Sequence, residues 1–176
     1  SLLYNTDHPD PNDPLHKYGV DDGFGFVYQG RAYKYIGYYV WKYWMHIIDG
    51  LNALADGYLY TGNQQYAHKA AILLDRIADV YPSMDWKPYA DRGWYHSDGN
   101  SGRGKIEGCI WETGVVQSLA DAYDKILSGT LKDTSLYEFL KEQSRKYKLS
   151  VSKGSRELFI SNVDEGILKT AFDAVL

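Results

Sequence analysis

The strongest constraint on the fold is a run of apolar side chains at three- and four-residue steps between residues 33 and 81. This spacing is typical of helices that bury one face. The first stretch ends at Gly62, a residue type that commonly terminates helices, and the second ends at Pro82. The sequence therefore predicts helices over 33–60 and 64–81, joined by a short turn into an antiparallel hairpin.

Three further helices follow from the same periodicity, over 106–127, 135–149 and 156–176. We expect Ser128-Gly129 to close the first of them. Ser135 would cap the second, with Glu138 completing a capping box. No segment shows convincing strand alternation, so the expected fold class is all-α.

The expected organisation is a single helical unit that follows an irregular N-terminal segment. Residues 1–30 are rich in turn-forming dipeptides, and residues 31–176 would form helical hairpins. The string Leu54-Ala-Asp56-Gly-Tyr58 recurs as Leu119-Ala-Asp121-Ala-Tyr123. Such an echo is expected in a solenoid or toroid of stacked hairpins, although chance also produces it.

Composition excludes several functions for the 176 residues. The net charge of −4 and the lack of a basic stripe argue against nucleic acid. No apolar run approaches the ~18 residues of a membrane span. The single cysteine, Cys109, is interpreted as a buried thiol, and the aspartates near the N-terminus match no calcium loop. We therefore expect no metal and no other cofactor.

Residues 92–112 carry the functional signal. This glycine-spaced loop combines arginines, a lysine, a histidine, an asparagine and two tryptophans. Glycines allow close backbone approach to a ligand, cations bind carboxylate or sulfate, and tryptophan offers a flat face to a sugar ring. This mixture suits an acidic polysaccharide, and the alternative is an ordinary surface loop.

Three stretches resemble the α/α-toroid domain of the heparinase II/III-type polysaccharide lyases. They are Asp21-Asp-Gly-Phe-Gly-Phe-Val27, Leu54-Ala-Asp-Gly-Tyr-Leu-Tyr-Thr-Gly-Asn63 with its continuation to Pro82, and Ser97-Asp-Gly-Asn-Ser-Gly-Arg-Gly-Lys-Ile106 with Ile110-Trp-Glu112. The resemblance covers residues 20–127 well and the remainder loosely. The third stretch is the most specific of the three.

The resemblance implies part of an incomplete α/α toroid that works with a β-rich region outside this chain. Such enzymes cleave uronic-acid polysaccharides by β-elimination, and the implied location is periplasmic or secreted, in bacteria. A Tyr or His removes the C5 proton, another protonates the leaving oxygen, and an Asn, His or Arg neutralises the uronate. In this family the catalytic Asn or His follows a helix like 162–176, and the Tyr lies further on. We therefore expect a fragment of a longer protein and assign no catalytic residue within it.

The candidate substrate-binding residues share a place in or beside the loop and are Trp94, His96, Asn100, Arg103, Lys105, Trp111 and Glu112. Each has a structural alternative. The tryptophans could pack in the core, the two cations could face solvent, and His96 and Asn100 could serve the surface and turns of the loop. A buried Glu112 needs a partner, which we expect to be a loop cation such as Arg103.

Two other functions stay open. An α/α-toroid glycoside hydrolase would use a pair of carboxylates, conceivably Asp98 and Glu112. A non-catalytic helical module that binds glycans or proteins is the second, because fold analogy alone does not define function. The sequence does not distinguish heparan sulfate from alginate or other uronides.

Overall fold

The structure is a computed structural model that describes residues 10, 12, 26–33, 36–85, 104–107, 109–149 and 151–175. Over these residues the fold is all-α, as the sequence predicts, with one small β-hairpin. The chain divides into two compact units. One comprises Ser1–Met45 with Asp85–Ile110, and the other comprises His46–Met84 with Trp111–Leu176.

The hairpin lies partly within the segment predicted to be irregular. β1 (Phe26–Tyr28) pairs with β2 (Arg31–Tyr33) in antiparallel register, with Val27 opposite Ala32. The turn residues Gln29 and Gly30 both have positive φ, at 50° and 74°. This is the backbone of a tight two-residue hairpin turn. The prediction of an irregular 1–30 segment is wrong at this point, because three-residue strands are too short to show alternation.

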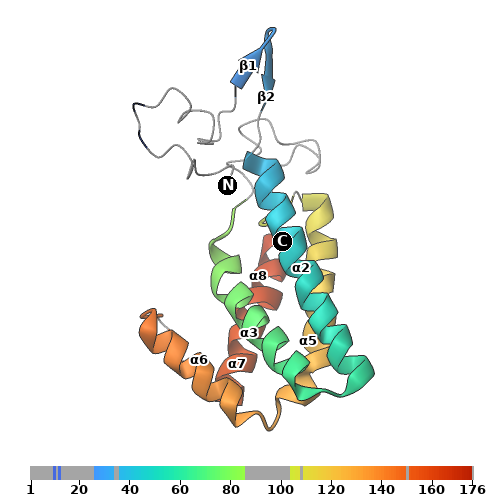
Figure 1. The fold of residues 1–176 in the computed structure, drawn as a ribbon, viewed down its shortest axis with the longest axis vertical. Coiled ribbons are helices and arrows are strands. Elements are labelled where there is room, and N and C mark those ends of the chain that lie inside the picture. The colour runs from blue at the N-terminus through green and yellow to red at the C-terminus, as the bar shows by residue number, and fades with distance from the viewer. Residues whose placement is uncertain are drawn as a thin grey trace. The chain divides into compact units, whose positions relative to one another are not determined.

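The predicted first helical hairpin is confirmed. α2 (Ile36–Thr61) is followed by α3 (Gln64–Val80), which runs back in the opposite direction from the turn that joins them (Figure 1). Gly62 has a φ of 66°, and its N–H donates to the carbonyl of Tyr58 at 2.8 Å, which terminates α2. The Asn63 side chain then accepts from the N–H of Gln65 and caps α3.

α5 (Cys109–Thr130) occupies the position of the third predicted helix, shifted by three residues at each end. The expected stop at Ser128-Gly129 is wrong, because α5 continues through Gly129. A β-carbon at Gly129 would lie 2.6 Å from Cβ of Ala67 and 2.7 Å from the ring of Tyr58. Gly129 therefore serves close helix packing rather than termination.

α6 (Thr134–Lys146) confirms the fourth predicted helix but not its cap. The N-cap residue is Asp133, whose carboxylate accepts from the backbone N–H of Leu136 at 2.9 Å. The Ser135 hydroxyl instead donates to Asp133 at 2.6 Å. The predicted Ser135 cap is wrong because an aspartate two residues earlier already satisfies the free N–H.

The last predicted helix is interrupted. α7 (Arg156–Val163) passes into a π-helical turn, η2 (Asp164–Lys169), and then into α8 (Thr170–Val175). The wider turn leaves backbone carbonyls without their usual partners, and the Thr170 hydroxyl donates to the carbonyl of Glu165 at 2.9 Å. Gly166 lies against the backbone of Ala78 in α3, closer than any residue with a β-carbon allows.

The core of the second unit centres on α3, which packs against α6, α7 and η2. Its buried face is largely alanine, which permits neighbouring helices to approach closely; these residues are Ala67, Ala70, Ala71 and Ala78. The two halves of the sequence echo occupy different environments. Ala55 is buried and Leu54 half-buried, whereas Leu119 is buried and Ala120 half-buried. The echo is therefore not a structural repeat in register, and the toroid stays a prediction.

Candidate functional site

Only three of the predicted site residues fall within the described part of the chain. Lys105 is half-buried in a bend ahead of α5, Trp111 is exposed and Glu112 is buried. The others, Trp94, His96, Asn100 and Arg103, lie outside the described residues, as does most of the 92–105 loop. Their roles stay predictions.

Glu112 is fixed from the core side. Tyr81, in the short 3₁₀ turn η1 (Tyr81–Ser83) that follows α3, is fully buried. Its hydroxyl donates to Oε1 of Glu112 at 2.6 Å. Burial, together with the charge and hydrogen bond of Glu112, raises the pKa of Tyr81, so the phenol stays protonated and remains a donor. The expected partner was a loop cation, and Tyr81 is a partner that the sequence analysis missed.

Trp111 precedes Glu112 in the first turn of α5, and its side chain faces solvent. Its exposed fraction is 57%, so the alternative of core packing is wrong. Neighbouring residues on a helix face different directions, and the burial of Glu112 at 8% exposure directs Trp111 outward. The indole of Trp111 is thus exposed beside a glutamate that Tyr81 holds in the core.

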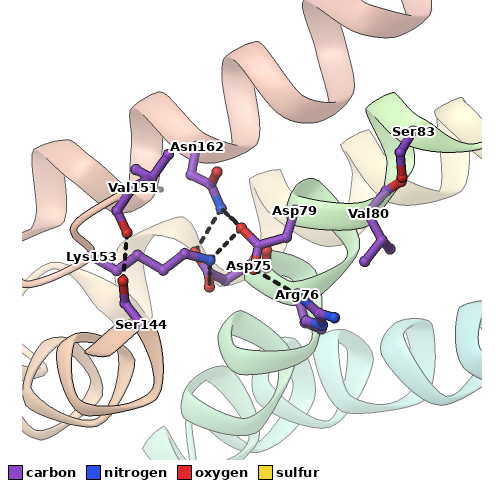
Figure 2. A network of polar contacts seen from close by, with 9 residues as sticks. All are labelled: Asp75, Arg76, Asp79, Val80, Ser83, Ser144, Val151, Lys153 and Asn162. Carbon is purple, nitrogen blue, oxygen red and sulfur yellow. Dashed lines mark hydrogen bonds and ion pairs between the residues drawn. The ribbon is translucent and has the colours of Figure 1, made fainter. Parts of the chain in front are cut away.

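A second polar cluster, which the sequence analysis did not identify, lies between α3 and the connection that precedes α7 (Figure 2). The ammonium of Lys153 is 1% exposed and lies 2.5 Å from carboxylate oxygens of both Asp75 and Asp79. The amide of Asn162 donates to the same two carboxylates, at 2.9 and 3.2 Å. Together these contacts tie α7 and its preceding connection to α3.

The charges in this cluster nearly balance. One buried lysine faces two aspartates, and Arg76 adds a second cation 3.4 Å from Asp79. Burial raises the pKa of Asp75 more than the contacts with Lys153 and Asn162 lower it. A cavity of about 380 Å³ is lined by Arg76, Asp79 and Asn162 but does not reach Lys153. We interpret the cluster as a structural clamp, because its central cation, Lys153, is 1% exposed and does not line the cavity.

Two further findings concern metal sites and membrane-spanning helices. Among the residues that the structure describes, no group of three or more His, Cys, Asp or Glu side chains is arranged to hold a metal ion. No helix in the described ranges is both long and apolar enough to cross a membrane.

Comparison of the chain with known proteins identifies no relative. No protein-family model, curated protein or solved structure matches it. The assignment of a function therefore depends on the residues themselves.

Proposed function

We propose that this chain is part of a polysaccharide lyase that cleaves a uronic-acid-containing polymer by β-elimination. Its helical hairpins would form part of an incomplete α/α toroid, and the loop before α5 would bind the acidic polymer. The proton-transferring residues would lie elsewhere in the parent protein, with the β-rich region. The chain would thus supply substrate binding rather than the chemical step.

The observation that carries the proposal is the exposure of Trp111 next to Glu112, whose carboxylate is held in the core by Tyr81. The indole is 57% exposed, while the adjacent Glu112 is held by the buried Tyr81 at 2.6 Å. Exposing so large an apolar surface is unfavourable in isolation, and a sugar ring stacked on the indole would cover it. The anchor limits the motion of the helix terminus, which lowers the entropic cost of binding.

The same geometry weighs against the hydrolase alternative. A general acid or nucleophile must reach the glycosidic bond. Glu112 is only 8% exposed, and its carboxylate accepts a hydrogen bond from Tyr81 within the core. A structural carboxylate that anchors the loop accounts for this environment more simply than a catalytic one.

The binding claim is tested with the chain itself. Calorimetric titration with polygalacturonate, alginate and heparan sulfate should show binding to at least one of them, and dextran should show none. Trp111→Ala should weaken binding about two- to tenfold, the loss of roughly one aromatic stacking contact of 0.5–1.5 kcal/mol. The matched control is Tyr60→Ala, because Tyr60 is also a solvent-facing aromatic, 83% exposed, near the C-terminal end of α2.

The chemical claim needs a second assay. Ultraviolet absorbance reports the unsaturated uronide that a lyase releases and a hydrolase does not. We expect no such product from residues 1–176 and steady release from the complete parent protein. Polymer binding without product from the complete protein would favour the non-catalytic module. Failure of every acidic polymer to bind would refute the proposal.

A further inference from the structure

A separate groove lies where three helix ends meet. α3 begins, α5 ends and α6 begins around a cavity of about 950 Å³, which we name the α3–α5–α6 groove. Its polar lining residues include Gln65, His68, Lys69, Ser128, Lys132 and Asp133. Trp111 lies in the first turn of α5 and Ser128 in the last, so the groove is about 25 Å along the helix from the site proposed above.

The groove holds two lysines without acidic partners. Lys69 and Lys132 are both exposed and both line it. In the described part of the chain, neither forms an ion pair with a carboxylate. The lysines at 125, 153 and 169 are by contrast all paired. In a chain of net charge −4, this pair of cations makes the groove locally positive.

The one carboxylate in the groove is already engaged. Asp133 accepts from the N–H of Leu136 at 2.9 Å, from the Ser135 hydroxyl at 2.6 Å and from Nδ1 of His68 at 2.7 Å. Burial would raise the pKa of Asp133, but these hydrogen bonds outweigh it and lower the pKa. The carboxylate is therefore ionised and satisfied from within the protein.

The orientation of His68 follows from this contact. An ionised carboxylate only accepts hydrogen bonds, so Nδ1 of His68 carries the proton that faces Asp133. Nε2 of His68 makes no hydrogen bond to any described residue, and the side chain is 27% exposed within the groove lining.

Three helix ends border the groove. α3 and α6 begin there and α5 ends there, and the two N-termini are already capped by Asn63 and Asp133. Part of the α5 terminus is already satisfied, because the Thr130 hydroxyl donates to the carbonyl of Leu127 and the Tyr137 hydroxyl donates to that of Thr130.

We infer that the α3–α5–α6 groove binds an oxyanion group, with Lys69 and Lys132 as charge partners. The shared chemistry is that of a carboxylate, sulfate or phosphate. Its source is either a free small anion or the end of an acidic sugar chain. The inference does not depend on the proposed lyase function, because no groove residue belongs to that site.

The test is a titration followed by amide chemical shifts in ¹⁵N-labelled protein. Sodium sulfate, sodium phosphate and digalacturonate are added separately at ionic strength held constant with chloride. We expect saturable shifts centred on Lys69, Lys132 and His68. The double variant Lys69→Gln/Lys132→Gln should weaken the affinity at least about tenfold, since two charge-assisted contacts are lost. Single Lys69→Glu should do the same by repulsion.

The charge-matched control is Lys146→Gln/Lys148→Gln, at the opposite end of α6 and outside the groove lining. It should leave the affinity unchanged. Binding by sulfate or phosphate alone identifies a free anion, and preference for digalacturonate identifies a sugar chain. The inference is overturned if no probe saturates, or if the control weakens binding as much as the groove variant does. It also fails if digalacturonate binding is lost in Trp111→Ala but kept in the groove variant.

Discussion

The ammonium of Lys153 lies 2.5 Å from a carboxylate oxygen of Asp75, although 78 residues separate them in the sequence. Both side chains are almost fully buried, at 1% and 4% exposure. The contact joins the connection before α7 to α3, two elements that lie far apart in the sequence. Asn162 strengthens the same junction from α7.

Replacing Lys153 with Met should destabilise the fold by about 3–5 kcal/mol, the usual result of removing one partner from a buried ion pair. Asp75 and Asp79 would then face each other without their shared cation. Chemical denaturation followed by circular dichroism measures the loss. Lys169→Met is the control, because its pair with Glu165 is exposed on both sides, and little change is expected. Equal effects of the two substitutions would show that the buried pair contributes no more to stability than the exposed pair.

Gly129→Ala should destabilise the protein by about 1–3 kcal/mol through overpacking, despite the better helix propensity of alanine. The new methyl group would lie 2.6 Å from Cβ of Ala67, which has no rotamer that moves it away. Gly114→Ala is the matched control in the same helix, with no atom within 4 Å of the added carbon. It should stabilise by roughly 0.5–1 kcal/mol. Thermal denaturation of both variants shows whether each substitution lowers or raises the stability.

Tyr81→Phe should cost about 1–3 kcal/mol, because it leaves Glu112 without the buried phenol that donates to it. Tyr58→Phe is the control, since its hydroxyl makes only an exposed contact with Ser128 at 3.2 Å. A change under about 0.5 kcal/mol is expected there. If Tyr81→Phe proves equally mild in a urea titration, Glu112 is held mainly by other contacts.

Asp133→Asn should change how stability depends on pH. The pKa of Asp133 is lowered in the folded state, so its contribution is present above the ordinary value of 3.8 and is lost as pH falls through the lower folded value. The wild type should therefore lose stability more steeply than the variant below pH 3.8. Asparagine can still cap α6, so the comparison isolates the effect of the Asp133 charge. Unfolding free energies at several acidic pH values test this, with Glu142→Gln as the exposed control; parallel curves would contradict it.

Local rules predicted most of the helices. Gly62 and Asn63 form the expected turn because both residues favour the backbone angles and capping bonds required there. The same rules failed at Gly129 and Ser135, where tertiary packing and a nearby Asp133 decide the outcome. Glycine as a helix terminator and glycine as a packing residue look identical in one sequence.

The buried cluster around Lys153 was harder to predict from the sequence. Asp75 lies four residues after Ala71 and eight after Ala67, on the buried face of α3, and this spacing was the available signal. Its partner, Lys153, stands in a Ser-Lys-Gly-Ser segment that is typical of a solvent-exposed loop. A contact between such distant residues depends on tertiary structure that periodicity does not encode. Trp111 and Glu112 were both predicted site residues, and the sequence left open whether Trp111 packs in the core.

The π-helical turn η2 affects the direction in which the side chains of the last helix face. Its buried apolar side chains recur every four positions, at Phe159, Val163, Ile167 and Ala171, with Gly166 buried beside Ile167. In a regular α-helix of 3.6 residues per turn, such a stripe rotates away from its contact by about 40° at each step. The wider turn at Asp164–Lys169 compensates for this rotation and returns Ala171 to the side that faces the core. Deleting one residue there would restore a regular helix and leave the later side chains facing the same way, because one residue fewer removes about 100° of rotation, as the wider turn does. The π-helical turn thus accommodates about one extra residue while α8 keeps Phe172 exposed to solvent.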